Sequence, residues 1–148
     1  MKYRLKNYYV DGFSAETLAK KFSTPLYCYS FKRLKKNITS FKKSFNSINP
    51  LICFSVKANS NRKLLNEIRK LGFGADVVSL GELMKALKSG IKSNKIVFSG
   101  VGKTEEELRY AIKKKILLIN TESKSEVLSI EKIAKKEKKI VNIGLRIN

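Results

Sequence analysis

Short apolar runs alternate with longer amphipathic stretches from residue 51 to the end of the chain. The runs are typical of buried strands, and they are Leu51–Val56, Gly74–Val78, Lys95–Phe98, Ile116–Ile119 and Ile140–Ile147. Between them, apolar side chains recur three and four residues apart, which is the spacing of one helix face. The predicted faces are Leu64, Leu65, Ile68 and Leu71; Leu80, Leu83, Met84 and Leu87; Leu108, Ala111 and Ile112; and Val127, Ile130, Ile133 and Ala134. The pattern therefore predicts a repeated β-α order.

Local signals mark the ends of the same helices. A hydroxyl residue followed three positions later by glutamate, the spacing of a capping box, occurs at Ser79–Glu82, Thr104–Glu107 and Ser123–Glu126. Gly72 and Gly90 stand just after two of the apolar faces, where a residue in the left-handed conformation commonly ends a helix. The prediction of these helices therefore rests on capping signals as well as on periodicity.

The first 50 residues carry a less regular pattern. It predicts a strand at Tyr8–Val10, a short helix at Ser14–Phe22, a second strand at Leu26–Tyr29 and an amphipathic helix at Ser30–Ser47. No linker rich in Pro, Gly or Ser and no low-complexity segment divides the chain. We predict an entry segment over residues 1–24, comprising a candidate strand of a separate β-domain and a short helix, and a partial β/α barrel over residues 25–148.

The β-α order predicts a parallel sheet, because strands joined by crossover helices run in the same direction. A doubly wound sheet and a (β/α)8 barrel both fit this order. A dinucleotide site would need G-x-G-x-x-G after the first strand, but Lys57-Ala58-Asn59-Ser60-Asn61 follows there, and the chain has no P-loop. The chain also stops at a predicted strand with no closing element. We expect the N-terminal portion of a (β/α)8 barrel, with about five of the eight strands, truncated before closure.

The charge balance is strongly positive, with 32 Lys and Arg against 12 Asp and Glu and a formal net charge of +20. The lysines recur on the polar sides of the predicted helices, as Lys32, Lys35 and Lys36 do opposite Phe31 and Leu34. This distribution is typical of solvated faces. No basic strand rich in aromatic residues and no nucleic-acid motif is present, so we expect no specific nucleic-acid partner.

The remaining composition points to a cytoplasmic protein. The apolar runs are far shorter than the roughly 20 residues that cross a bilayer, and the N-terminus leads into no apolar signal core, so we expect no membrane association. Cys28 and Cys53 lie in strand-like runs and are interpreted as small buried thiols. The chain has no histidine, the commonest zinc ligand, and we predict no metal site.

Lys57 is the first candidate for chemistry, because it closes the apolar run Leu51–Val56. Reactive groups of β/α barrels stand at the carboxyl ends of strands. A lysine amine shielded there from water is neutral more readily, and it can attack a carbonyl to form a Schiff base. The alternative interpretation is a lysine that ends a strand in solvent, which position alone favours.

The segment Phe54-Ser55-Val56-Lys57-Ala58-Asn59 resembles the cofactor-lysine segment of the pyridoxal-phosphate enzymes of the alanine-racemase-like barrel class. Further blocks follow in order and are similar to those of the diaminopimelate decarboxylases within that class. They are Gly74–Leu83, Phe98–Thr104, Asn120–Ser123 and Gly144–Asn148. Ahead of them, Thr24-Pro25-Leu26-Tyr27 fits the entry of that family's chain into the barrel. Alanine racemases usually continue from the lysine into a Tyr-Gly-rich stretch, and ornithine-type enzymes have a Cys-containing block where Val77–Glu82 stands here. The resemblance covers almost the whole chain.

The resemblance implies pyridoxal 5′-phosphate as cofactor, with Lys57 as the catalytic residue that holds it. The cofactor-binding residues implied beside Lys57 are Asp76, next to the cofactor linkage, and Arg146, a cation that faces the cofactor. Without the resemblance, Asp76 is equally well interpreted as a helix cap and Arg146 as a surface residue. The implied reaction is decarboxylation of meso-2,6-diaminopimelate to L-lysine and CO2, in lysine biosynthesis, by a cytoplasmic homodimer.

Other interpretations of the function stay open. The family's stacking histidine, phosphate loop, partner of the pyridine nitrogen and catalytic cysteine cannot be assigned in this chain, so we expect the isolated chain to be inactive. Another basic amino-acid decarboxylase of the same class, acting on ornithine, arginine or lysine, remains an alternative. So do a non-catalytic remnant, a basic binding module and one half of a split enzyme.

Overall fold

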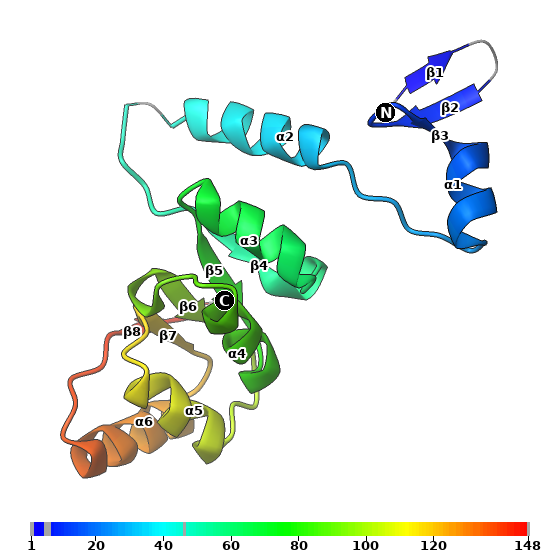
Figure 1. Cartoon of the computed structure of the whole chain (residues 1–148). Helices are drawn as coiled ribbons and strands as arrows, with labels where there is room; N and C mark the ends of the chain where they lie inside the picture. The colour runs from blue at the N-terminus through cyan, green and yellow to red at the C-terminus, as the bar shows by residue number, and fades with distance from the viewer. Residues whose placement is uncertain (1, 5–6, 46, 148) are drawn as a thin grey trace. The chain divides into compact units, whose positions relative to one another are not determined.

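The computed structural model describes residues 2–4, 7–45 and 47–147, which form two compact units, Met1–Pro50 and Leu51–Asn148. Figure 1 traces the elements of both units along the chain. Among the described residues no helix combines the length and the apolar character needed to cross a membrane. The division of the chain at residue 24 stays a prediction.

The first unit contains a small antiparallel sheet followed by two helices. Its elements are β1 (Lys2–Arg4), β2 (Asn7–Val10), β3 (Phe13–Ser14), α1 (Ala15–Phe22) and α2 (Phe31–Lys43). The sheet has the order β1-β2-β3. Hydroxyl caps begin both helices, because Ser14 accepts a hydrogen bond from Thr17 N and Ser30 accepts one from Arg33 N.

The strand predicted at Leu26–Tyr29 is absent, and this prediction was wrong. The described segment pairs with no other strand, and the side chains of Tyr27 and Tyr29 are exposed. An apolar run without a neighbouring strand gains neither a hydrogen-bond ladder nor burial of one face. Cys28, which lies in this run, is a free thiol and only half buried.

The second unit is a parallel sheet with helical crossovers. Its elements are β4 (Cys53–Ser55), α3 (Arg62–Lys70), β5 (Gly74–Val77), α4 (Leu80–Lys88), β6 (Ile96–Phe98), α5 (Glu105–Lys113), β7 (Leu118–Thr121), α6 (Lys124–Glu137) and β8 (Ile143–Leu145), with short 3-10 turns at Val56–Ala58 and Ser93–Lys95. The strand order is β4-β5-β6-β7-β8, and every neighbouring pair is parallel. The predicted β-α repeat is confirmed.

The strand order also distinguishes the two fold classes that the pattern left open. A doubly wound sheet reverses its strand order at one point, whereas this sheet adds each new strand at the same edge. Crossovers between adjacent parallel strands are right-handed, so a sheet that grows in one direction has all its helices on one face. This is the arrangement of a β/α barrel, as predicted. Helices α5 and α6 lie side by side on it (Figure 1).

The two faces of the sheet differ in burial. Alternate strand residues are fully buried and pack under the helices: Ala75, Val77, Ile96, Phe98 and Ile119. The apolar helix faces that the sequence predicts bury Leu65, Ile68, Leu83 and Leu108 against them. The intervening strand residues are only partly buried, and they are Ser55, Asp76, Val97, Leu118 and Asn120. We call this second side of the sheet the inner face, and it carries the polar groups.

Candidate active site

Parallel strands place their carboxyl ends at the same edge of the sheet, and polar residues gather at that edge here. The register pairs Ser55 of β4 with Asp76 of β5, and Asn120 of β7 with Gly144 of β8. Ser99 follows β6 directly, and its backbone N donates to Val77 O at 2.8 Å. Residues from β4, β5, β7 and β8 and from the loop after β6 thus lie at one end of the inner face.

A chain of hydrogen bonds crosses this edge. The Ser99 hydroxyl lies 2.6 Å from Asp76 Oδ1, and Asn120 Nδ2 lies 3.0 Å from Ser99 Oγ. Asp76 was predicted as a site residue, whereas sequence analysis assigned no role to Ser99 or Asn120. Both belong to blocks that the family resemblance picked out, and this was the only signal that could have found them.

Lys57 lies in the 3-10 turn Val56–Ala58 that follows β4. Its side chain is exposed, and within the described residues its ammonium group forms no hydrogen bond or ion pair. Position alone predicts an exposed lysine here, and the structure agrees on that point. The role of Lys57 as the lysine that holds the cofactor stays a prediction. Two residues earlier, Ser55 Oγ is buried without a hydrogen-bond partner, in the same row of the inner face as Asp76.

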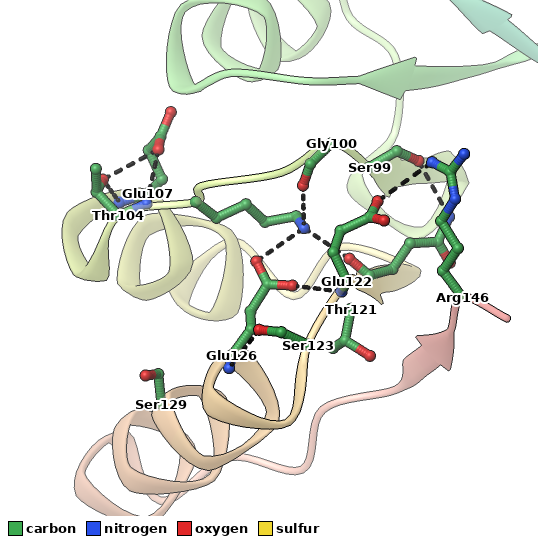
Figure 2. A network of polar contacts seen from close by, with 12 residues as sticks. Ser99, Gly100, Thr104, Glu107, Thr121, Glu122, Ser123, Glu126, Ser129 and Arg146 are labelled. Atoms are coloured by element: carbon green, nitrogen blue, oxygen red, sulfur yellow. Dashed lines mark hydrogen bonds and ion pairs between the residues drawn. The ribbon is translucent and has the colours of Figure 1, made fainter. Parts of the chain in front are cut away.

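Arg146 stands beyond the end of β8. Its backbone N donates to Thr121 O at 3.0 Å, so the ladder between β7 and β8 extends to this residue. Its guanidinium Nη1 lies 3.6 Å from Glu122 Oε1, and the arginine side chain is 60% exposed while that of Glu122 is 12% exposed (Figure 2). Glu122 is thus the carboxylate partner of this cation in the structure, and the role of Arg146 toward the cofactor stays a prediction.

Lys103 is buried beside this edge, in the loop between β6 and α5. Its side chain is 1% exposed, and its ammonium donates to Gly100 O at 2.7 Å, to Asn120 O at 2.6 Å and to Glu126 Oε1 at 3.0 Å. The same ammonium lies 5.8 Å from the centre of the Phe98 ring. It thereby joins the loops that follow β6 and β7. Sequence analysis missed this pair, because it assigned Glu126 only to a helix cap.

The three predicted capping boxes take two forms. Thr104 and Glu107 form the complete box, in which each side chain accepts from the other residue's backbone N. At α4 and α6 the serine caps form as predicted, but the glutamates reach one residue further back, so that Glu82 accepts from Val78 N and Glu126 from Glu122 N. The cap backbone explains the difference, since φ is −75° at Thr104 but near −157° at both serines.

The predicted helix ends at Gly72 and Gly90 are confirmed, since both residues have a positive φ. Lys115 and Lys138 occupy the same left-handed position after α5 and α6. Ile116 N and Lys139 N then bond back to Ala111 O and Ala134 O, as expected of this type of helix end.

Residues 31–148 match the sequence model of the family described as "Pyridoxal-dependent decarboxylase, pyridoxal binding domain". The chain belongs to this family of pyridoxal-dependent decarboxylases. The match begins at the first residue of α2 and includes the whole second unit, so the inner-face edge described above lies within the pyridoxal binding domain.

Relatives in the decarboxylase family are closely similar in sequence. The chain is 45% identical to diaminopimelate decarboxylase of Helicobacter pylori strain J99 over 92% of its own length, and 43% identical to that of Aquifex aeolicus over 100%. These alignments cover 34% and 35% of the relatives. The chain thus spans about a third of the length of the curated relatives it matches.

Solved structures agree with the sequence comparison. The protein AQ1208 from Aquifex aeolicus is 43% identical with a TM-score of 0.94, and the alignment covers 99% of this chain and 36% of that one. Diaminopimelate decarboxylase from Helicobacter pylori, solved with L-lysine, is 44% identical with a TM-score of 0.86 over 90% of this chain and 34% of that one. A lysine/ornithine decarboxylase from Vibrio vulnificus, 13% identical with a TM-score of 0.78, shares the fold over 90% of this chain and 35% of that one.

Glu107 links two neighbouring helices of this pyridoxal binding domain. Its Oε2 accepts from Thr104 N and Oγ1, and its Oε1 accepts from Leu80 N at the start of α4. Burial alone would raise the pKa of Glu107, but the hydrogen bonds from Thr104 and Leu80 and the charge of Lys103 outweigh it, so the pKa lies below its ordinary value. The folded state therefore favours the ionised carboxylate.

We expect Glu107→Ala to lower the free energy of unfolding by about 1–2 kcal/mol, because it leaves the backbone donors at two helix starts unpaired. A lowered pKa stabilises the fold fully above the ordinary carboxyl pKa, and this stabilisation is lost as the pH falls through the lowered value. Urea unfolding between pH 7 and pH 3 measures both effects. Glu106→Ala, an exposed residue in the same turn, is the matched control. Equal stability of the two variants at pH 7 would contradict this interpretation.

The Cys53 thiol reports on the charge of Asp76. Burial raises the pKa of Cys53, and the negative charge of Asp76 raises it further. The thiolate is therefore disfavoured, and we expect alkylation of Cys53 by iodoacetamide to be slow at pH 8. Asp76→Asn removes the charge and should accelerate it severalfold, with Cys28 in the same sample as the internal control. Peptide mass spectrometry measures both rates. An unchanged Cys53 rate would mean that the Asp76 carboxylate does not act on this thiol.

Proposed function

We propose that this chain is the cofactor-binding part of a pyridoxal-phosphate-dependent decarboxylase that converts meso-2,6-diaminopimelate to L-lysine and CO2. One observation carries the proposal: Lys57 lies in the turn that follows strand β4, at the edge of the parallel sheet that also holds Asp76, within a chain that matches a pyridoxal binding domain. The relatives named diaminopimelate decarboxylase support the choice of reaction.

The residues at this edge suit the chemistry of pyridoxal phosphate. Lys57 offers a primary amine without a competing partner among the described residues, and an amine can join the aldehyde of the cofactor. Ser55 Oγ is a buried hydroxyl that lacks a partner on the same face, which is unusual unless a further group satisfies it. Arg146 supplies a permanent cation for an anionic group. The donor set thus matches the aldehyde and the acidic groups of this cofactor.

When bound, pyridoxal phosphate withdraws electrons from the Cα atom of an amino acid and so makes loss of its carboxylate as CO2 feasible. The chain's own residues have three tasks. Lys57 Nζ would hold the cofactor through its aldehyde and, when released from it, would hold or move a proton. The Asp76 carboxylate provides a negative charge that favours protonated nitrogen nearby. Arg146, paired with Glu122, attracts anionic groups to the edge of the sheet.

The substrate is proposed from the relatives. The Helicobacter pylori and M. jannaschii diaminopimelate decarboxylases, at 44% and 37% identity, have been solved with L-lysine. L-Lysine is the amino acid that decarboxylation of diaminopimelate yields. Structures of arginine and lysine/ornithine decarboxylases are only 22% and 13% identical to this chain, which supports the fold and not their substrates. We further propose that the whole enzyme acts as a homodimer in the cytoplasm.

The proposal is tested in a chimaera in which this chain replaces the matching third of Aquifex aeolicus diaminopimelate decarboxylase, to which it is 43% identical. With pyridoxal phosphate added, we expect the chimaera to release CO2 from meso-diaminopimelate and to produce L-lysine. Ornithine, arginine and lysine, assayed in parallel, are expected to react far more slowly. A folded chimaera that binds the cofactor but releases no CO2 from diaminopimelate would refute the proposed function.

A further inference from the structure

We propose that Ser99 and Asn120 are positioning residues that fix the orientation of the Asp76 carboxylate beside the cofactor. The inference rests on the proposed function for its catalytic consequence. The structural claim, that Ser99 and Asn120 hold the Asp76 carboxylate, rests on the hydrogen bonds at the inner-face edge. Neither residue approaches the reacting atoms in this role, since both act through Asp76.

The direction of each hydrogen bond follows from the chemistry of the groups. An ionised carboxylate can only accept, so the single Ser99 hydroxyl proton, 2.6 Å from Asp76 Oδ1, points to Asp76. The Ser99 oxygen can then only accept from Asn120, whose Nδ2 lies 3.0 Å away. The asparagine amide thus prevents the serine proton from turning toward β7. An acceptor in place of this amide would compete with Asp76 for the same proton.

Both the backbone carbonyl and the side-chain amide of Asn120 are held in place. Its backbone carbonyl accepts from the buried Lys103 ammonium at 2.6 Å, and Lys103 is neutralised by Glu126. The side-chain Oδ1 lies so close to Gly144 that a Cβ atom at position 144 would collide with it. Gly144 therefore leaves the space that this amide orientation requires. The buried ion pair is connected through Asn120 and Ser99 to Asp76.

Asp76 needs such support because, among the described residues, the bond from Ser99 is the hydrogen bond that holds its carboxylate. Its neighbours in the same row of the sheet are Ser55 on β4 and the apolar Val97 on β6. A half-buried aspartate without a partner exchanges among its staggered rotamers. The Asp76 carboxylate can act on one nitrogen of a bound cofactor in only one of these rotamers. A misplacement of about 1 Å can cost about 10²-fold in rate.

The structural test uses the 148-residue chain without cofactor. The χ1 rotamer of Asp76 is measured by NMR from its three-bond couplings in the parent chain and in Ser99→Ala, Ser99→Thr and Asn120→Asp. We expect one rotamer in the parent and in Ser99→Thr, which keeps the hydroxyl, and averaged rotamers in the other two. Asn120→Asp preserves shape but exchanges the donor for an acceptor. Ser125→Ala on α6, whose hydroxyl contacts Ser123, is the matched control.

The catalytic test uses the same variants in the chimaera. We expect Ser99→Ala and Asn120→Asp to lower kcat about 10²-fold with little change in KM, and Ser99→Thr to restore most of it. A single Asp76 rotamer in both Ser99→Ala and Asn120→Asp would overturn the inference, as would unchanged kcat in an active chimaera. If the parent chimaera is inactive, the proposed function fails while the NMR measurement still decides whether Ser99 and Asn120 hold Asp76.

Discussion

Replacement of Lys57 by alanine in the chimaera with the Aquifex aeolicus enzyme should lower kcat by about 10³-fold or more, because a positioned proton-transfer group alone contributes up to about 10⁴-fold. The loss should be in kcat rather than only in KM, since the role proposed for this amine is both to hold the cofactor and to move a proton. Lys57→Arg should not restore activity, because a guanidinium stays charged and is a poor nucleophile. Rates of CO2 release at saturating substrate measure the effect.

Lys63→Ala is the matched control for this experiment. Lys63 is an exposed lysine in the first turn of α3, six positions after Lys57, and its removal should leave kcat within about twofold. The two variants separate the specific role of Lys57 from the general loss of one positive charge in a chain of net charge +20. Equal activity of Lys57→Ala and Lys63→Ala would show that Lys57 has no specific role in the reaction.

Breaking the buried pair of Lys103 and Glu126 should have the largest effect on stability. Lys103→Met leaves the Glu126 carboxylate, whose side chain is only 8% exposed, without its cation. Loss of one partner of a buried pair typically costs about 3–5 kcal/mol. The variant also removes the donor to the carbonyls of Gly100 and Asn120. Chemical unfolding of the purified chain at pH 7 measures the difference.

Three further variants make this prediction specific. Lys135→Met breaks the exposed pair with Glu131, whose side chains are 75% and 54% exposed, and should change stability by no more than about 0.5 kcal/mol. If Lys103→Met does not fold, Glu126→Gln supplies the measurement, because it removes the charge and preserves the shape. The double variant Lys103→Met/Glu126→Leu should recover part of the loss. A Lys103→Met chain as stable as the Lys135→Met chain would contradict a stabilising role for the buried pair.

Periodicity and capping signals predicted the second unit well, because they reflect local physics. The capping serines and the glycines after α3 and α4 depend on backbone groups within a few residues, and the sequence contains both partners. Strand bounds were less accurate: the run Leu51–Val56 contains only Cys53–Ser55 as strand. A strand ends where its neighbour stops pairing, and an apolar run alone does not carry that information.

The site could be predicted only in part from the sequence, because it depends on contacts between residues that are distant along the chain. Lys57, Asp76 and Arg146 were proposed through the blocks that resemble a family, whereas position alone favoured a solvent-exposed lysine at position 57. The burial of Lys103 was not predictable, because its partners Gly100, Asn120 and Glu126 come together only when the loops after β6 and β7 meet. A lysine in a highly basic chain gives no local signal that distinguishes a buried ammonium from a solvated one.

The most direct test of the account is to map where pyridoxal phosphate attaches to this chain. The purified chain is incubated with less than one equivalent of cofactor, reduced with sodium borohydride so that the lysine linkage becomes permanent, digested and analysed by peptide mass spectrometry. The account predicts that the pyridoxyl label is concentrated on Lys57 and is lost from that peptide in Lys57→Ala. A label spread evenly over the surface lysines, with no preference for Lys57, would contradict it.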